Sequence, residues 1–231
     1  MILLFAAAIA AATASAAPAL CPDVVTAEAF VCRAMEASAG GKPETAAAAF
    51  EQAALATDEA DPAKSRMLAA AGNMWIAAAQ PGKAALALDR ALAGTGLQAE
   101  QRGEALLDRA RAAEAQNDLK TARAKLNEAA TTISDDPFYW YFSAALAIRE
   151  FDKATAQSAI SRALSLAPSD PTILFEAGHV AHFAGDEAKA RIYWGQAAQF
   201  DANGPIGKAA RDALALLPVP VTHKTAPAKG N

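Results

Sequence analysis

The sequence predicts an all-α protein whose helices stack into a solenoid, and three observations lead to this fold class. First, an alanine followed by a large apolar residue four places later, and by a second alanine three places after that, occurs five times. Second, the copies repeat at 38 residues from Ala46 to Ala84 and Ala122, and at 34 residues from there to Ala156 and Ala190. Third, glycine, asparagine and proline interrupt the pattern where helical hairpins must turn. A period in this range is typical of repeats that bury their apolar faces against their neighbours.

The composition fits closely packed helices. Hydrophobic residues make up 53% of the 231 residues, but aromatic residues make up only 6%. Alanine is the strongest helix former and has a small side chain, so helices rich in it can approach closely. The five copies of the alanine pattern are Ala46/Phe50/Ala53, Ala84/Leu88/Ala91, Ala122/Leu126/Ala129, Ala156/Ile160/Ala163 and Ala190/Trp194/Ala197.

The charge distribution excludes nucleic acid as a partner. Lysine and arginine number 21 against 25 aspartates and glutamates, which gives a formal net charge of −4. No basic run or arginine-rich stripe occurs along the chain. Proteins that bind nucleic acid need such a positive surface.

The N-terminal residues 1–16 have the features of a signal peptide. They carry no charge, and small residues at Ala14 and Ala16 favour cleavage before Ala17. No lysine or arginine precedes the apolar stretch, which is unusual for a leader and is consistent with a start further upstream. We therefore expect export, to the periplasm. The alternative is an uncleaved N-terminal anchor in the inner membrane, because the first charge is Asp23.

The two cysteines, Cys21 and Cys32, flank the end of a short N-terminal segment, residues 17–26. In an oxidising compartment, two nearby thiols with no others in the chain predict one disulfide. A loop this short would stabilise the protein by about 2–3 kcal/mol. The alternative is two unpaired thiols, with Cys32 packed in a helix. A redox-active pair is not expected, because the spacing is not Cys-x-x-Cys.

Alignment on the alanines gives five units, 27–60, 65–98, 103–136, 137–170 and 171–204. In the fourth unit, Trp140, Ala144 and Pro168 stand where the tetratricopeptide repeat has its tryptophan, glycine and closing proline, so the chain resembles that family. The resemblance implies a right-handed superhelical solenoid of about five helix-turn-helix repeats. The corresponding residues of the fifth unit are Leu174, Gly178 and Ala202. In the second unit, Leu68 and Gly72 stand at the tryptophan and glycine positions, and Trp75 stands at the tyrosine position of the repeat.

The connections between units are marked by aspartate-proline pairs. At Asp61-Pro62, Asp136-Pro137 and Asp170-Pro171, the aspartate can cap a helix whose first turn holds the proline. Two joints carry four extra residues each, 61–64 and 99–102. Either the flanking helices are one turn longer there, or the superhelix bends.

The C-terminal end of the chain divides into a helix and a tail. Residues 205–217 have apolar side chains on one face and polar ones on the other, as expected for the helix that caps the end of a solenoid. Residues 218–231 contain three prolines and two lysines without periodicity, so we expect a disordered tail.

In the tetratricopeptide family, the first helices of successive repeats line a concave groove. The resemblance implies that the second, fifth, ninth and twelfth places of each unit face it. The predicted partner-binding residues are Asn73, Arg111, Tyr141, Phe175, His179 and His182. The C-terminal half is the more aromatic, since it also holds Phe138, Phe142 and Phe183, and aromatic side chains often anchor bound peptides. These last three residues alternatively pack between repeats, and exposure of Tyr141 and Phe175 in the groove is left open.

Some members of the family hold a peptide carboxylate with lysine, asparagine and arginine. Asn73 and Arg111 fall at two such places, but Ala69 and Leu107 stand where lysines are needed. A carboxylate clamp is therefore not expected. Arg111 can equally pair with a neighbouring acidic residue, Glu114 or Asp108.

Glu176, His179 and His182 follow one another at three-residue spacing. Two histidines spaced in this way can share a metal ion. However, successive members of such a series rotate by about 60° around a helix of 3.6 residues per turn, so the three converge poorly. We expect neither a metal site nor a cofactor.

Two classes of function remain. The first is a scaffold or adaptor that binds a peptide or helix of another periplasmic or membrane-associated protein in its groove. The second is an envelope-associated hydrolase or an accessory subunit of one. The chain has no Gly-x-Ser-x-Gly, His-Glu-x-x-His or phosphate-binding loop, so an enzyme is not expected. Self-association through the end helix is compatible with the first class.

Overall fold

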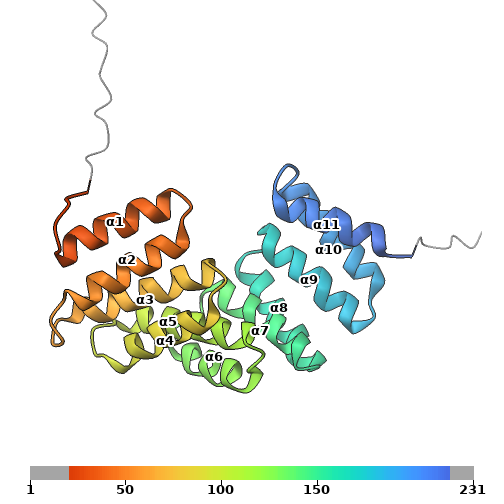
Figure 1. The fold of residues 1–231 in the computed structure, drawn as a ribbon. Helices are drawn as coiled ribbons and strands as arrows, with labels where there is room; N and C mark the ends of the chain where they lie inside the picture. The colour runs from red at the N-terminus through yellow and green to blue at the C-terminus, as the bar shows by residue number, and fades with distance from the viewer. Residues whose placement is uncertain (1–20, 219–231) are drawn as a thin grey trace, which may run out of the picture.

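The computed structural model describes residues 21–218, which form eleven α-helices joined by short turns, without a strand in that range (Figure 1). The predicted all-α superhelical solenoid is confirmed. The proposed signal peptide and all but the first residue of the proposed tail lie outside the described residues. The helices are α1 (Ala27–Ala39), α2 (Pro43–Leu55), α3 (Pro62–Ala77), α4 (Pro81–Ala93), α5 (Ala99–Ala115), α6 (Leu119–Ile133), α7 (Pro137–Arg149), α8 (Lys153–Leu166), α9 (Pro171–Ala184), α10 (Glu187–Phe200) and α11 (Pro205–Leu216).

Consecutive helices pair into five antiparallel hairpins, and α11 follows the last of them. We call α1, α3, α5, α7 and α9 the first helices and their partners the second helices. The ten alanines of the recurring pattern are fully buried on the second helices, and the large residue between each pair is also buried. The pattern therefore marks the face that packs against the first helix of each hairpin.

Close packing of the hairpins depends on two glycines. A Cβ atom added to Gly72 would lie 2.4 Å from Cγ of Leu88, and one added to Gly178 would lie 2.2 Å from Nε1 of Trp194. Both distances are far inside van der Waals contact. In the second and fifth hairpins, the large residue of the second helix thus occupies the space that the glycine leaves on the first helix.

The aspartate-proline pairs begin helices as expected from their sequence. Asp61, Asp136 and Asp170 each accept a hydrogen bond from a backbone N–H in the first turn of α3, α7 or α9. The extra residues at the two long joints extend α3 and α5, which have 16 and 17 residues. Of the two alternatives for these joints, the longer helix is the one observed.

The turns inside the hairpins use left-handed backbone conformations. Gly41 and Gly185 have φ of 66° and 86°, and Asn117 has 63°, all at breaks that the sequence indicates. The fourth hairpin turns at Phe151, with φ of 58° and a side chain that is 84% exposed. A bulky residue rarely adopts this conformation, so its backbone is strained here.

The N-terminal segment is bonded to the first helix. Cys21 and Cys32 form a disulfide with their Cα atoms 5.6 Å apart. Arg33 strengthens the connection by donating to the carbonyl oxygens of Pro22 and Val24. The predicted disulfide is thus present, in place of the two unpaired thiols.

At the other end of the solenoid, α11 packs against α10 and α9. Its Ala210 is buried, and Leu217 directly after it is buried as well, in one cluster with Leu174 and Trp194. The carboxylate of Asp201 accepts hydrogen bonds from the first N–H groups of α11 and fixes its start. This helix therefore covers the apolar face that the fifth hairpin presents.

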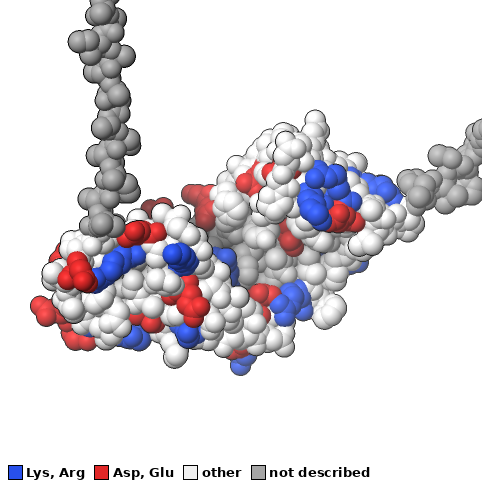
Figure 2. All heavy atoms as spheres, turned by 45° about the horizontal axis from the view of Figure 1, so that its top comes forward, with Lys and Arg blue, Asp and Glu red and all other residues white. Residues whose placement is uncertain are grey.

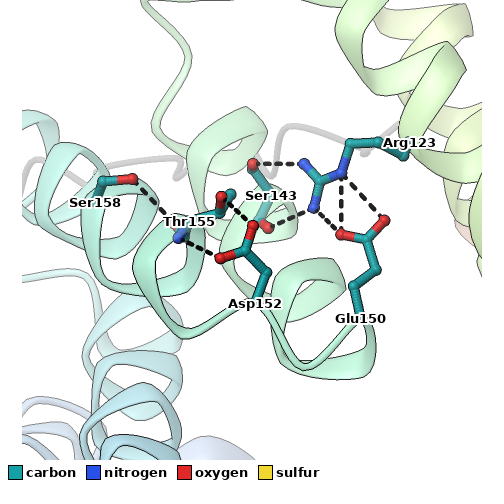
Figure 3. Close-up of polar contacts among 6 residues, drawn as sticks. All are labelled: Arg123, Ser143, Glu150, Asp152, Thr155 and Ser158. Carbon is teal, nitrogen blue, oxygen red and sulfur yellow. Dashed lines mark hydrogen bonds and ion pairs between the residues drawn. The ribbon is translucent and has the colours of Figure 1, made fainter.

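The joint between α6 and α7 is bridged by a polar cluster (Figure 3). Arg123 of α6 donates to both carboxylate oxygens of Glu150 at the end of α7, with 2.5 Å from Nη2 to Oε2. Its Nη1 donates to the hydroxyl of Ser143, 3.2 Å away. The neighbouring Asp152 caps α8 through Thr155. This guanidinium connects the N-terminal half of the solenoid, α1–α6, to the C-terminal half, α7–α11.

The two halves leave an open concave side, with α1 and α9 on opposite sides of it in Figure 1. In the space-filling view the surface is hollowed between the halves (Figure 2). Within residues 21–218, no helix has the length and apolar character needed to cross a membrane.

Candidate binding groove

The first helices of the N-terminal half surround a hollow of about 500 Å³, a volume typical of binding pockets. We call it the N-terminal hollow. Its polar lining residues are Ser38, Arg66, Asn73, Gln101, Glu104 and Asp108. Its large apolar lining residues are Met35, Phe50, Met74, Leu97 and Leu107.

The apolar lining of the N-terminal hollow is adaptable. Met35 projects from α1 with 60% of its surface exposed, and Met74 is half-buried on α3. Methionine side chains are flexible and polarisable, so such a surface can adjust to partners of different shape. Phe50, which is buried, forms the base of the hollow.

Carboxylates crowd the α5 side of the N-terminal hollow. The pKa of Glu104 is raised by its partial burial first, and then by the negative charges of Glu100, Asp108 and Asp136. The carboxylate of Asp108 accepts hydrogen bonds from Nδ2 of Asn73 on α3, at 2.7 Å, and from Nη1 of Arg111 on α5, at 2.8 Å. The polar side of this hollow therefore has a negative character around Glu104.

A second hollow, of about 490 Å³, lies between α7 and α9 in the C-terminal half. We call it the C-terminal hollow. Its large or charged lining residues are Ile148, Arg149, Glu176, His179, His182 and Phe183. Two of the predicted partner-binding residues, His179 and His182, are thus brought together in one cavity.

The titratable groups of the C-terminal hollow differ in their surroundings. Burial alone raises the pKa of Glu176 to about 7. The pKa of His179 is lowered, by burial first and then by the neighbouring His182. His182 is exposed, with Nδ1 at 3.0 Å from Oε1 of Glu187. Arg149 pairs with Glu114 and donates to Oδ1 of Asn117 at 2.8 Å, so α5 and its turn hold its charge.

The aromatic residues of the C-terminal half do not form one exposed patch. Phe142 is buried, whereas Phe138 is 46% exposed and meets Tyr141 edge to face at 6.3 Å between ring centroids. Tyr141 is half-buried, and burial is the main cause that raises its pKa. Phe175 is also half-buried, because it packs edge to face on His179 at 4.5 Å. Neither Tyr141 nor Phe175 is freely exposed.

Comparison with solved structures identifies the architecture. PilW, described as a widely conserved type IV pilus biogenesis factor, matches with a TM-score of 0.66 at 18% identity over 81% of this chain and 82% of its own. MamA matches with 0.59 at 18% identity over 83% and 98%, respectively. YrrB, described as a TPR protein with an unusual peptide-binding site, matches with 0.56 at 17% identity over 80% and 92%. The fold is that of a tetratricopeptide repeat solenoid.

These similarities define the fold and leave the partner open, since every identity is below 20%. No protein-family model matches the sequence, and no curated protein matches it either.

Two side chains of this protein stand where some tetratricopeptide repeat proteins hold a peptide carboxylate, and both already have an acceptor. Asn73 and Arg111 both bond the carboxylate of Asp108, one through each oxygen. This pairing is one of the two that the sequence allows for Arg111, and Glu114 instead pairs with Arg149. The internal Asp108 carboxylate thus occupies donors that would otherwise meet a peptide carboxylate.

Sequence reasoning missed the most unusual polar groups of this groove. Glu104 falls at the second place of its unit, which the tetratricopeptide pattern directs into the groove, and this position could have identified it. The sequence indicated Glu176 only as a candidate metal ligand together with His179 and His182. In residues 21–218, no group of three or more histidine, cysteine, aspartate or glutamate side chains is arranged to hold a metal ion. Nothing in the local sequence indicates that Glu176 is half-buried in a hollow.

Proposed function

We propose that this protein is an interaction scaffold that binds a peptide or helix of another protein along the groove of its first helices. The observation that carries the proposal is the pair of hollows on that groove, one in each half, with volumes of about 500 and 490 Å³. Each combines apolar side chains with a few polar groups, which is the usual composition of a recognition surface. A single bound segment reaching both hollows would contact all five hairpins.

The predicted partner-binding residues fit this proposal in different ways. Asn73 lines the N-terminal hollow, and His179 and His182 line the C-terminal hollow. Arg111 and Tyr141 belong to α5 and α7, the first helices between the two hollows, while Phe175 supports the ring of His179. We assign binding contacts to Asn73, His179 and His182, and contacts or supporting roles to the other three.

A relative of similar fold supports the assignment of a peptide as the ligand class. YrrB is described as a tetratricopeptide repeat protein with an unusual peptide-binding site. We extend that ligand class, and not the site itself, to the present chain. Partner identity is left to experiment.

We also propose that the protein is exported to the periplasm. The apolar leader-like stretch of residues 1–16 and the Cys21–Cys32 bond support this location, because disulfides persist in oxidising compartments. An uncleaved N-terminal anchor is the alternative. N-terminal sequencing of the mature protein from the envelope fraction distinguishes them, since export with cleavage predicts a first residue at Ala17.

Affinity capture from envelope extract with the full chain tests the scaffold. Three variants accompany the parent protein: Tyr141→Ala/Phe175→Ala/His179→Ala for the C-terminal half, Met35→Ala/Asn73→Ala for the N-terminal hollow, and Leu86→Ala as a control. Leu86 is 69% exposed on the second helix α4 and lines neither hollow.

The expected result is a stoichiometric partner that the parent and the Leu86 variant retain, and that at least one groove variant loses while remaining folded. A partner retained equally by every variant would place binding outside the groove. No specific partner in any extract would count against a scaffold and leave self-association, which sedimentation of the parent protein measures.

A further inference from the structure

Glu176 has the least compensated carboxylate in the described groove. It lies on α9 and lines the C-terminal hollow, yet no ion pair or hydrogen bond within residues 21–218 involves its carboxylate, and burial is the only cause that shifts its pKa. Neighbouring carboxylates are paired, Glu114 with Arg149 and Glu187 with His182. Glu176 is half-buried, and partial removal of a carboxylate from water without a partner is unfavourable, so this position favours a ligand that supplies a positive charge.

The remaining lining of the C-terminal hollow suits an aliphatic stem. Ala145, Ile148 and Phe183 are its apolar members. Lysine and arginine side chains lie along apolar surfaces with their methylene groups and place the charged head at a polar site. The cavity, at about 490 Å³, has space for such a side chain. An apolar side chain would cover the same surface but leave the carboxylate unpaired.

The charges around the hollow do not replace the missing cation. Among residues 21–218, Arg149 is the only cationic side chain that lines it apart from the histidines, and Glu114 and Asn117 at the end of α5 hold its guanidinium. An acidic ligand would meet Glu176 directly and Glu187 nearby. Charge complementarity therefore selects a basic group over an acidic one.

We propose that the C-terminal hollow is a recognition pocket for one lysine or arginine side chain of the bound protein segment, with Glu176 as the carboxylate that pairs with it. This inference rests on the proposed function, because the basic side chain belongs to the segment in the groove. It names the partner chemistry: a basic residue in the same segment that contacts the adaptable N-terminal hollow. This preference is the reverse of a clamp for a peptide carboxylate.

The pairing makes binding depend on pH with a defined sign. Glu176 must be ionised to hold the cation, and it loses its charge as the pH falls through about 7. The other titratable groups facing the hollow are His179 and His182, with Glu187 and Tyr141 beside them, and a histidine can only add positive charge as the pH falls. Both effects weaken binding of a basic side chain in acid, by up to about tenfold per pH unit below the pKa of Glu176.

Carbon-13 NMR of the glutamate carboxyl groups in the full chain tests the pocket directly. The probes are Nα-acetyl-lysine methylamide and Nα-acetyl-norleucine methylamide, whose neutral side chain has the same four carbon atoms without the ammonium group. We expect the lysine derivative to lower the titration midpoint of Glu176 by about one pH unit or more and to shift the methyl signals of Ile148. The norleucine derivative should leave the midpoint of Glu176 at or above its starting value.

Two variants complete the test. In Glu176→Gln, which keeps the shape of the side chain, the lysine-dependent shift of the Ile148 signals should disappear. In Glu104→Gln, which removes a carboxyl group from the other hollow, it should remain. A Glu176 midpoint that does not respond to the lysine derivative up to its solubility limit, or that responds equally to norleucine, would overturn the pocket. Retention of the full lysine response by Glu176→Gln would also overturn it.

The outcome of this NMR test does not depend on the outcome of the capture experiment. A captured partner together with an unresponsive Glu176 would overturn the basic-residue pocket alone. A lysine response without any captured partner would support the pocket and overturn the scaffold. A partner that is captured at pH 8 by the parent protein but not by Glu176→Gln would support both the scaffold and the basic-residue pocket.

Discussion

The two halves of the groove carry hollows of nearly equal size but different chemistry. The N-terminal hollow has two methionines and the carboxylates of Glu104 and Asp108, whereas the C-terminal hollow has two histidines and one half-buried carboxyl group, Glu176. The buried face of each hairpin, by contrast, repeats the same alanine spacing five times. Packing is therefore specified by repetition along the chain, and recognition by the positions at which the repeats differ.

The largest effect on stability should come from truncating, in each half, the large side chain that packs against a glycine of the first helix. Trp194→Ala in the C-terminal half should lower the free energy of unfolding by about 3–5 kcal/mol, and Leu88→Ala in the N-terminal half by about 2–5 kcal/mol. Because repeats contact mainly their neighbours, the loss should be local. Hydrogen exchange should therefore increase in α9–α11 for the first variant and in α3–α5 for the second. Uniformly faster exchange over all helices would mean that the halves unfold as one unit.

The next effect on stability distinguishes the half-buried carboxyl group of Glu176 from the exposed carboxyl groups. The pKa of Glu176 is raised from an ordinary 4.5 to about 7 in the folded protein, so the folded state binds more protons between these values. Stability from this group is complete below pH 4.5 and is lost as the pH rises through 7, by about 2–3 kcal/mol at most. Urea unfolding at pH 5 and pH 8 should show this loss in the parent and not in Glu176→Gln. An equal loss in both proteins would assign it to other groups.

A smaller effect is expected at the joint between the halves. Arg123→Ala leaves the carboxylate of Glu150 and the hydroxyl of Ser143 without their shared donor, which should lower the free energy of unfolding by about 1–2 kcal/mol. Lys125→Ala on the same helix removes only an ion pair three residues apart and should change stability by less than about 0.5 kcal/mol. Thermal unfolding followed by circular dichroism measures both. Similar melting temperatures for the two variants would contradict a stabilising role of the Arg123 bridge.

The smallest effects concern the turns of the last two hairpins. Phe151→Gly should raise the free energy of unfolding by up to about 1 kcal/mol, because glycine adopts the φ of 58° without strain and the lost side chain is exposed. Gly185→Ala, at φ of 86° in the next hairpin, should lower it by about 1 kcal/mol. Chemical denaturation of both variants gives the comparison. A destabilising Phe151→Gly change would show that the exposed ring makes a favourable contact in solution.

The sequence predicted the parts of the fold that depend on neighbours along one hairpin. In the fourth hairpin, Ile160 lies about one helical turn after Ala156 and one turn before Ala163. The common buried face of these three residues therefore follows from local spacing alone. The aspartate-proline starts of the helices are equally local. The turn at Phe151 was not indicated, because the residue type there opposes the conformation that the hairpin imposes.

The groove was less predictable, because its properties depend on side chains from two or three helices. Tyr141 and Phe175 fall at groove-facing positions, but ring contacts with Phe138 and His179 cover part of each. Similarly, the capture of Asn73 and Arg111 by one carboxylate, that of Asp108, requires the spacing between α3 and α5 to be known. Sequence position gave the face of the helix, and tertiary packing decided the exposure and charge of each residue.

The bond between Cys21 and Cys32 makes the position of the N-terminal segment depend on the redox state of the surroundings. It ties the segment before α1 back onto that helix, and Arg33 of α1 donates to the carbonyl oxygens of Pro22 and Val24 in the same segment. Helix α1 contributes Met35 to the N-terminal hollow, but the bonded segment, residues 21–26, lines no part of it. Reduction would therefore release the segment while α1 kept its packing on α2. Both hollows should keep their shape in either redox state, and only the end of the solenoid beside α1 would change.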